Sequence, residues 1–194
     1  MFPQMTAILT PQKQGIAEID HYTVTPLESQ MSAWCRGAYC PEGRYAVLRV
    51  GRTLMMSDTL LERRSNREVV INSRGDVLIA GLGLGMILHP ILARAEVRSV
   101  TVIEKYQDVI DLVRPTLPAE KLTIICADIH QWMPEKTARF STIYFDIWPN
   151  ICTDNLEAIK QLHRRFRKYL LRDGGEWMGS WQHEELKSLK RSGR

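Results

Sequence analysis

The amino-acid sequence predicts an α/β fold in which a parallel central sheet follows a small N-terminal β extension. Three observations lead to this prediction. From Asp76 onward, short apolar runs alternate with segments of helical periodicity, which is typical of βαβ units. The first run ends in three alternating glycines, Gly81, Gly83 and Gly85. The second ends on Glu104, whose carboxylate can accept hydrogen bonds from a ribose diol. Because parallel strands end at one edge, we expect a nucleoside-binding site there.

The composition is that of an ordinary globular domain. The chain has 194 residues, 44% hydrophobic and 25% charged, which suffices for one α/β domain with its own core. No apolar run approaches the length of a membrane span, and the N-terminus lacks the basic-then-apolar order of a secretion signal. These features argue against a membrane or secreted protein, and we expect a cytoplasmic location.

The cysteines and histidines show no metal-binding pattern. No two cysteines form a C-x-x-C pair, so we expect neither a zinc site nor a disulfide between Cys35 and Cys40. Cys126 ends an apolar run and is expected to be a small buried residue. The fourth cysteine is Cys152, and the scattered histidines are His21, His89, His130 and His183. We therefore predict no metal ion.

Residues 1–75 are expected to form the β-rich extension, and residues 76–194 the nucleoside-binding domain. Within the extension, residues 45–50 and 53–56 are predicted strands joined by Gly51 and Arg52, a pair suited to a type II′ hairpin turn. The stretch 57–75 is polar and ends in a turn. Its arginines, which we expect to border the binding site, are Arg63, Arg64 and Arg67.

Five strands and four helices are predicted after the extension. Apolar runs predict strands over residues 77–80, 100–103, 122–126, 141–145 and 176–181. Helices are expected over residues 86–95, 107–114, 154–171 and 182–189. Pro90 lies near the first turn of the first helix, and Pro115 stops the second. Thr153 is the expected N-cap of the longest helix, whose apolar side chains share one face.

The glycine spacing separates two kinds of nucleoside site. A dinucleotide fingerprint needs a small residue where this chain has Met86. The spacing G-x-G-x-G instead resembles motif I of the class I S-adenosylmethionine-dependent methyltransferases and of the related spermidine synthases. This resemblance implies a Rossmann-like fold and S-adenosylmethionine, or its decarboxylated form, as cofactor. The cofactor-binding residues that it implies are Gly81, Leu82, Gly83, Gly85, Glu104, Lys105, Asp128, Ile129 and Asp146.

Two aspartates follow the third and fourth strands. The resemblance makes Asp128 the acceptor for the adenine amino group and the backbone N–H of Ile129 a donor to the ring; a helix N-cap is the alternative role of Asp128. Asp146 stands where class I enzymes place the residue nearest the reacting centre, followed by Trp148. We identify these two as the candidate catalytic residues, Asp146 as base or orienter and Trp148 as a stacking partner. A loop-capping aspartate and a core tryptophan are the alternative interpretation.

The sequence departs from a complete spermidine synthase, which it resembles over residues 45–181. Those enzymes carry a second acid after the fourth strand, and here Trp148 occupies that neighbourhood. Their upstream acidic, aromatic segment is not clear in residues 57–62. Only thirteen residues follow Trp181, so the last two strands of the family's sheet are either missing or replaced by N-terminal ones.

The cofactor's amino group also lacks an obvious partner. Many methyltransferases have an acid two positions before the first glycine, where this chain has Ile79. Asp76, Asp58, Glu62 or backbone carbonyls are the candidates for this task.

The predicted function is S-adenosylmethionine-dependent methyl transfer to a small, nitrogen-containing acceptor. One alternative is spermidine-synthase-like aminopropyl transfer, disfavoured by the missing second acid. The other is a non-catalytic nucleoside- or partner-binding protein, favoured by Ile79 and the short C-terminus. The expected partner is a small-molecule substrate, and a homo-oligomer is left open. Basic residues over 163–168 and near the C-terminus favour a solvated helix face over a nucleic-acid interface.

Overall fold

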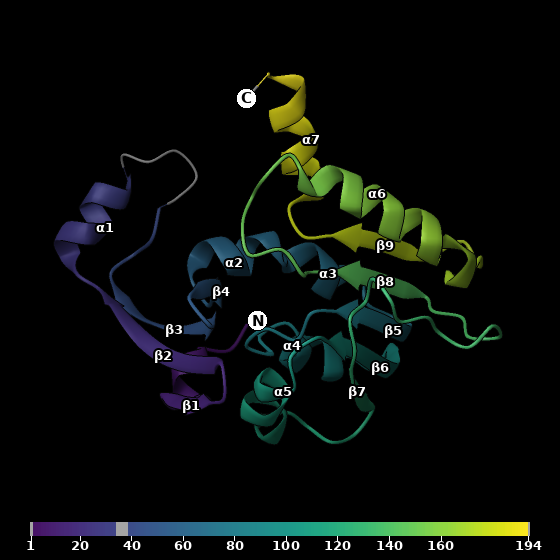
Figure 1. Cartoon of the computed structure of the whole chain (residues 1–194), viewed down its shortest axis with the longest axis horizontal. Coiled ribbons are helices and arrows are strands. Elements are labelled where there is room, and N and C mark those ends of the chain that lie inside the picture. The colour runs from purple at the N-terminus through teal and green to yellow at the C-terminus, as the bar shows by residue number, and fades with distance from the viewer. Residues whose placement is uncertain (1, 34–38, 194) are drawn as a thin grey trace.

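The computed structural model describes residues 2–33 and 39–193, which form two β-sheets and their flanking helices (Figure 1). The first sheet is antiparallel, with strand order β1-β2-β3-β4. Its strands are β1 (Gln12–Gln14), β2 (Ala17–Val24), β3 (Gly43–Val50) and β4 (Thr53–Ser57). The predicted hairpin is confirmed, because β3 and β4 pair directly across Gly51 and Arg52. Cys35, and with it the question of a Cys35–Cys40 disulfide, lies outside the described residues.

The second sheet contains five parallel strands in the order β7-β6-β5-β8-β9. Its central strand β5 pairs with β6 on one side and β8 on the other, so the chain changes direction across the sheet at this strand. Ligands bind at such a switch point, beyond the carboxyl ends of the strands. The strands are β5 (Gly75–Ala80), β6 (Val97–Glu104), β7 (Leu122–Cys126), β8 (Thr142–Phe145) and β9 (Trp177–Ser180).

Helices cover both faces of the parallel sheet. Alternate side chains of β5 belong to two separate cores, with Val77 and Ile79 in one and Leu78 and Ala80 in the other. The first core includes side chains of α3 (Arg67–Asn72), α4 (Leu88–Leu92) and α5 (Gln107–Val113), and the second those of α6 (Asn155–Phe166). Burial on both faces explains why β5 is a continuous apolar run. The remaining helices are α1 (Pro26–Ala33), α2 (Leu60–Ser65) and α7 (His183–Arg191).

Several helices differ from the prediction. The first helix after β5 is only Leu88–Leu92, with Pro90 inside it, and the longest ends at Phe166 rather than at residue 171. A 3₁₀ turn, Arg167–Tyr169, follows it. The helix cannot continue through Leu170, because the backbone of that residue forms a β-bridge with Phe140. Thr153 is not the N-cap: Asp154 takes that position, without a side-chain capping bond.

The polar stretch 57–75 is not irregular, as the sequence suggested, because it contains α2 and α3. Each helix has six residues, too few for a periodic pattern to be recognised. Cys126 is also corrected: it is exposed, because it ends β7, an edge strand that pairs with β6 alone.

Within residues 2–33 and 39–193 no strand follows β9. The N-terminal strands do not replace the missing strands of the parallel sheet, because they form their own sheet. Among the described helices, none has the length and apolar character needed to cross a membrane. The division into domains at residue 75 remains a prediction.

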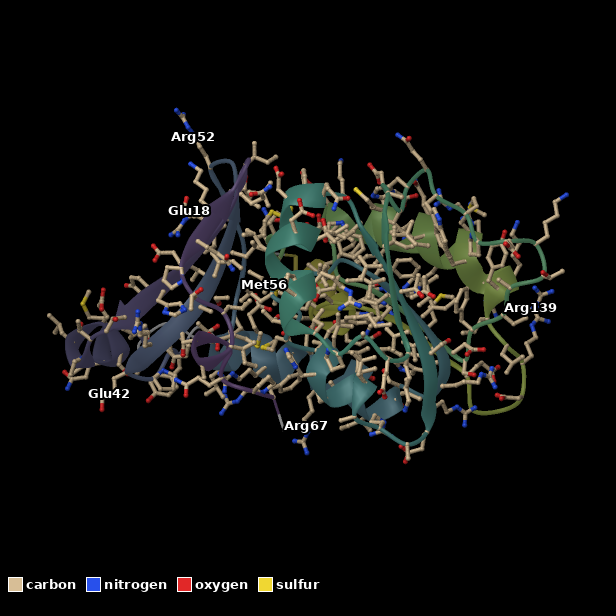
Figure 2. All side chains as sticks on the ribbon, turned by 90° about the horizontal axis from the view of Figure 1, so that it is seen from below. Glu18, Glu42, Arg52, Met56, Arg67 and Arg139 are labelled. Atoms are coloured by element: carbon tan, nitrogen blue, oxygen red, sulfur yellow. The ribbon has the colours of Figure 1, made fainter. Side chains whose placement is uncertain are left out.

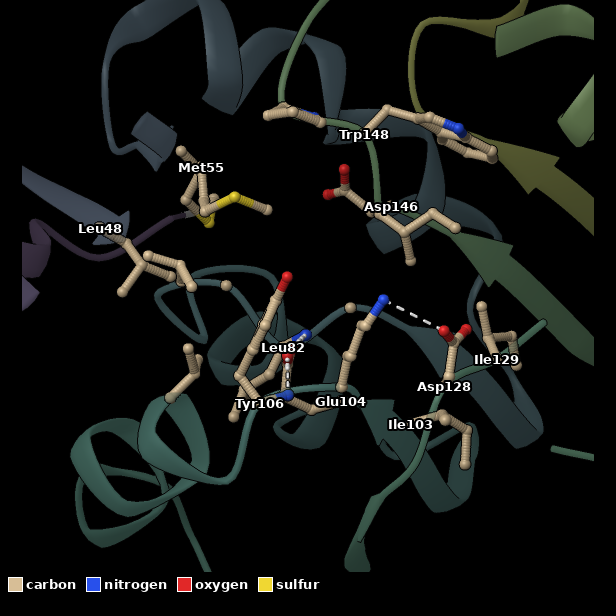
Figure 3. Close-up of a pocket in the computed structure, with 18 of the residues that line it drawn as sticks. Leu48, Met55, Leu82, Ile103, Glu104, Tyr106, Asp128, Ile129, Asp146 and Trp148 are labelled. Atoms are coloured by element: carbon tan, nitrogen blue, oxygen red, sulfur yellow. Dashed lines mark hydrogen bonds and ion pairs between the residues drawn. The ribbon is translucent and has the colours of Figure 1, made fainter. Parts of the chain in front are cut away.

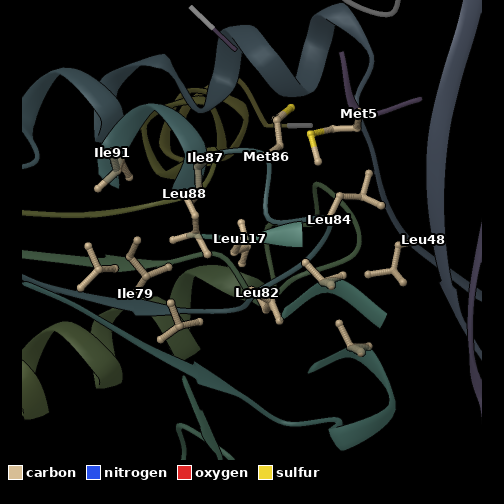
Figure 4. Close-up of a cluster of buried hydrophobic side chains, with 14 of the residues drawn as sticks. Met5, Leu48, Ile79, Leu82, Leu84, Met86, Ile87, Leu88, Ile91 and Leu117 are labelled. Carbon is tan, nitrogen blue, oxygen red and sulfur yellow. The ribbon is translucent and has the colours of Figure 1, made fainter. Parts of the chain in front are cut away.

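An apolar seam joins the antiparallel sheet to the glycine loop (Figure 4). Met5 and Leu48 share a buried cluster with Leu82, Leu84 and Met86 from the loop after β5. All five side chains are at most 3% exposed. Met56, labelled in Figure 2, is partly buried and packs against this cluster, while labelled charged residues such as Arg52 and Arg139 reach outward.

A buried carboxylate fixes the extension internally. Asp58, fully buried, accepts hydrogen bonds from the backbone N–H groups of Met5 at 2.9 Å and Ala46 at 2.8 Å. Its Oδ2 also pairs with the guanidinium of Arg63 at 3.0 Å. These donors tie the N-terminal turn, β3 and α2 to one side chain.

We predict that Asp58→Ala lowers the free energy of unfolding by about 2–4 kcal/mol, because it leaves buried donors and a partly buried arginine unpaired. Urea titration measures this loss. Glu184→Ala, which removes an exposed pair with Lys187, is the control and should cost less than about 1 kcal/mol. Equal losses in the two variants would contradict the role given to Asp58.

Candidate functional site

A cavity of about 360 Å³ lies between the antiparallel sheet and the carboxyl ends of the parallel strands (Figure 3). Its volume is in the range of small-molecule sites. Most residues that the sequence singled out line it: Gly81, Leu82, Gly83, Glu104, Lys105, Asp128, Ile129, Asp146 and Trp148. Gly85 is the exception. It packs against Val113 and Leu117 instead, and we propose no ligand contact for it.

The glycines let other segments of the chain approach the backbone of this loop closely. Gly81, Gly83 and Gly85 have positive φ angles of 99°, 53° and 73°, which other residues rarely adopt. A Cβ on Gly81 would stand 2.0 Å from the backbone oxygen of Asp146. On Gly83 it would stand 2.1 Å from the sulfur of Met56. The loop therefore brings β5, the segment after β8 and the antiparallel sheet together around the cavity.

Glu104 joins the loop after β5 to the loop after β6 at the base of the cavity. One carboxylate oxygen accepts the N–H of Leu82 and the other the N–H of Tyr106, each at 2.9 Å. The residue is only 7% exposed, and burial raises the pKa of its carboxyl against the opposing effect of these backbone donors. Each oxygen keeps a free lone pair, so the carboxylate can still accept hydroxyl hydrogen bonds from a ligand.

Asp128 and Lys105 line the same cavity and form an ion pair with each other. Oδ1 of Asp128 accepts the N–H of His130 at 2.9 Å, and Oδ2 pairs with Nζ of Lys105 at 3.2 Å, the dashed line in Figure 3. Both contacts, the His130 bond first, lower the pKa of Asp128. The N–H of Ile129 donates to no acceptor within the described residues. This strand end therefore offers one carboxylate acceptor and one free backbone donor.

Asp146 lies just beyond β8, where its N–H continues the ladder to the carbonyl of Ala80 at 2.8 Å. Its carboxylate points into the cavity beneath Trp148 (Figure 3) and has no hydrogen-bond partner among the described side chains. Burial raises the pKa of Asp146 to about 7. Trp148 packs partly against the cores beneath α6 and partly lines the cavity. Its role as a stacking partner stays a prediction.

The roof of the cavity was not predicted from the sequence. It comes from the β3–β4 hairpin, whose apolar side chains face the glycine loop, and the sulfur of Met56 accepts the N–H of Leu84 at 3.0 Å. The only signal was the apolar character of the hairpin, which does not show where its sheet docks. The hairpin residues at the cavity are Leu48, Val50, Thr53, Met55 and Met56.

Several residues considered from the sequence lie elsewhere. Arg63, Arg64 and Arg67 do not line the cavity, contrary to expectation. Asp76 binds Arg98 and Ser99 at the opposite end of the sheet, and Asp58 is committed to the extension. No group of three or more histidine, cysteine or acidic side chains within the described residues is arranged to hold a metal ion.

No protein-family profile matches the sequence, and no protein of curated function matches it significantly. Solved structures do resemble the fold. The spermidine synthase from Thermotoga maritima matches with a TM-score of 0.55 and 16% identity, over 85% of this chain and 54% of its own. A spermidine synthase complexed with the transition-state analogue AdoDATO matches with a TM-score of 0.52 and 15% identity, over 83% and 52%.

The chain shares the Rossmann-like fold of these spermidine synthases. The plantazolicin methyltransferase BpumL, solved in complex with SAH, matches over 55% of this chain and 41% of its own, with 18% identity and a TM-score of 0.43. The chain spans about half the length of the spermidine synthases that it matches. At these identities the likeness establishes the fold, and function must be argued from the site itself.

We predict that Gly81→Ala is much more destabilising than Gly174→Ala. Both glycines have positive φ, which costs an alanine about 1–2 kcal/mol, but only Gly81 faces a backbone oxygen at 2.0 Å, whereas Gly174 has open space. The additional loss for Gly81→Ala should therefore exceed about 1 kcal/mol in urea unfolding. Equal losses would show that Asp146 does not approach the glycine loop as described.

Proposed function

We propose that the protein binds S-adenosylmethionine in this cavity and transfers its methyl group to a small, nitrogen-containing acceptor. The observation that carries the proposal is the convergence of three carboxylates, from the ends of β6, β7 and β8, on one cavity beside the glycine loop. The acids are Glu104, Asp128 and Asp146. The matched spermidine synthases, one of which was solved with AdoDATO, add support through the fold alone.

The residues at the base of the cavity suit an adenosine group. Glu104 is fixed by two backbone donors and retains acceptor capacity for a ribose diol. The free N–H of Ile129 and the carboxylate of Asp128 match the acceptor and donor atoms at the edge of an adenine ring. Lys105 holds Asp128, but its side chain is 59% exposed, so it can turn toward solvent when a ligand amino group takes its place.

When bound, the sulfonium group supplies an activated methyl group and its own leaving group. The protein is then left to position the acceptor and to take up a proton. Among the described residues, the carboxylate of Asp146 has no hydrogen-bond or ion-pair partner, and its pKa of about 7 makes it a base suited to neutral pH. Trp148 offers an aromatic surface next to it. The Met55 and Met56 side chains above help to exclude water from the cavity.

Aminopropyl transfer from the decarboxylated cofactor is the second candidate. It is favoured by the match to spermidine synthases over more than four-fifths of this chain. A non-catalytic nucleoside-binding protein, a cytoplasmic location and a homo-oligomer remain hypotheses based on the sequence.

We expect Glu104→Ala to weaken binding of S-adenosylmethionine by about 1–3 kcal/mol, which is roughly 5- to 150-fold, because two charge-assisted hydrogen bonds are lost. Calorimetric titration measures the affinity. Glu96→Ala, which alters an exposed acid just before β6, is the matched control and should leave affinity unchanged. An unchanged affinity in Glu104→Ala would place the nucleoside elsewhere. Tighter binding of the decarboxylated form would favour aminopropyl transfer.

We expect turnover to rise with pH through about 7, because burial raises the pKa of Asp146 to that value and only the ionised carboxylate can accept a proton. Asp146→Asn should reduce turnover by about 10²-fold or more while changing cofactor affinity only a few-fold. The assay is release of S-adenosylhomocysteine with an acceptor found by screening small amines. Parallel losses of affinity and turnover would make Asp146 a cofactor-binding residue instead.

A further inference from the structure

We propose that a second cavity, beside the antiparallel sheet, binds a small molecule that has an apolar body and a carboxylate, with the carboxylate on Arg49. This outer cavity has a volume of about 410 Å³, within the range of small-molecule sites. The residues that line it are Tyr22, Val24, Glu28, Ser32, Cys40, Tyr45, Val47, Arg49, Leu54, Ser57 and Thr59. None of them lines the cavity at the glycine loop, so the proposal is independent of the proposed function.

The β3–β4 hairpin separates the outer cavity from the cavity at the glycine loop. Val47 and Arg49 of β3 line the outer cavity, whereas Leu48 and Val50 line the other one. Successive side chains of a strand point to opposite faces of the sheet, so the two cavities lie on opposite faces of the hairpin. Leu54, which pairs with Arg49 across the hairpin, lines the outer cavity as well.

An extra residue in β4 preserves this alternation. The pairing passes from Met56 opposite Leu48 directly to Leu54 opposite Arg49, so Met55 has no partner of its own. Met55 and Met56 therefore both line the cavity at the glycine loop, although they are neighbours in the sequence. The polar and charged character of the outer face is thus a separate property of the hairpin.

The outer cavity has an apolar floor that a ligand can reach from solvent. Val24 and Val47 are buried, whereas Tyr22 and Leu54 are about half exposed. Helix α1, which contributes Glu28 to the wall, lies farther from the parallel sheet than the antiparallel strands do (Figure 1). The combination of buried and half-exposed apolar side chains is that of a binding cleft rather than of a closed core.

The acid and the tyrosines of the outer cavity already have partners in the protein. The carboxylate of Glu28 accepts the hydroxyl of Tyr22 at 2.7 Å, and it accepts the N–H and the hydroxyl of Thr25 at 2.7 and 2.9 Å. The hydroxyl of Tyr45 donates to the carbonyl of Pro41 at 2.9 Å. Three donors therefore occupy most of the acceptor capacity of Glu28, which leaves little for a ligand amine.

The remaining hydroxyl groups are also paired. Those of Ser57 and Thr59 bond to each other at 3.0 Å, and Oγ of Ser32 accepts the N–H of Cys40 at 3.0 Å. Burial raises the pKa of the Cys40 thiol, which keeps it uncharged at neutral pH. The lining is consequently apolar apart from groups that the protein itself satisfies, with Arg49 as its one cation.

Arg49 has no partner of opposite charge within the described residues. It belongs to none of their ion pairs, and the hydrogen bonds that their arginine side chains make come from other arginines. Glu18 stands opposite Arg49 on β2, but it is exposed and forms no ion pair with it. The half-buried guanidinium can therefore bind a ligand anion.

A carboxylate on an aromatic body matches these features. The planar guanidinium donates two parallel N–H groups to a carboxylate, and partial burial strengthens such a bond. Tyr22 and Tyr45 are direct neighbours across β2 and β3, so their rings offer adjacent aromatic surface for the body of the ligand. A phosphate or a longer polyanion would need several free donors, and the lining has only those of Arg49.

The test compares hydrocinnamate with hydrocinnamyl alcohol, which has the same ring and chain length without the charge, by calorimetric titration. The wild type should bind the carboxylate at least about 10-fold more tightly than the alcohol. Arg49→Gln should abolish this preference, and Arg49→Lys should retain part of it, because an ammonium group lacks the planar fork. Arg52→Gln, which alters an exposed arginine in the turn of the same hairpin, is the matched control and should behave as the wild type does.

A variant with increased affinity guards against loss of the fold. Glu18→Gln removes the negative charge opposite Arg49, so it should bind hydrocinnamate about 2- to 5-fold more tightly than the wild type. A damaged protein would not gain affinity. Unchanged or weaker binding by Glu18→Gln would show that the carboxylate does not lie at Arg49.

Alkylation of cysteine shows where the ligand binds. Cys40 lines the outer cavity, and Cys152, which is likewise only partly exposed, lines neither cavity. Saturating hydrocinnamate should slow modification of Cys40 by iodoacetamide at least about 3-fold and leave Cys152 unchanged, as measured by mass spectrometry of the peptides.

The outcomes separate this proposal from the proposed function. Equal affinity of the wild type for the acid and the alcohol, a preference that survives in Arg49→Gln, or unprotected Cys40 would overturn the outer site. Titration with S-adenosylhomocysteine tests the cavity at the glycine loop alone. Its failure would overturn the proposed function and leave the outer site in place.

Discussion

The buried carboxylate of Glu104 is the interaction on which the arrangement of the site depends. Its two oxygens accept the N–H groups of Leu82 and Tyr106, which belong to the loops after β5 and β6. These bonds compensate part of the cost of burying a charge, and they hold two loops in a fixed relation. Gly81 completes the constraint, because only a residue without a Cβ lets the chain after β8 pass so closely. The ends of three parallel strands are thereby fixed around one cavity.

The antiparallel sheet turns this strand edge into an enclosed site. Asp58 organises the extension internally, and apolar contacts from Met5 and Leu48 seat it on the glycine loop. The same extension carries α2, whose Ser65 accepts the indole N–H of Trp181, while the adjoining Asn66 accepts the hydroxyl of Tyr144 from β8. An N-terminal segment thus supplies the roof of the cavity and is tied to the ends of the parallel strands. The parallel sheet alone would present its carboxylates to open solvent.

The sequence predicted the parallel sheet well because its strands are buried on both faces and form continuous apolar runs; the bounds of β7 agree exactly with those expected. Most of the residues that it singled out do line the cavity, since glycines and acids at strand ends converge by topology, but the hairpin residues of the roof were not predicted. It failed where long-range contacts decide the structure. The helices α2 and α3 are short and depend on bonds such as Tyr144 to Asn66, and Cys126 is exposed because its strand lies at an edge.

A crystal structure of the protein with S-adenosylhomocysteine would test the central claim most directly. The account predicts that the ligand occupies the cavity between the two sheets, with its ribose hydroxyls on Glu104 and its adenine at Ile129 and Asp128, and with Lys105 turned away from Asp128. Asp146 should remain free to face the acceptor beneath Trp148. A ligand bound outside this cavity, or with its ribose away from Glu104, would contradict the account.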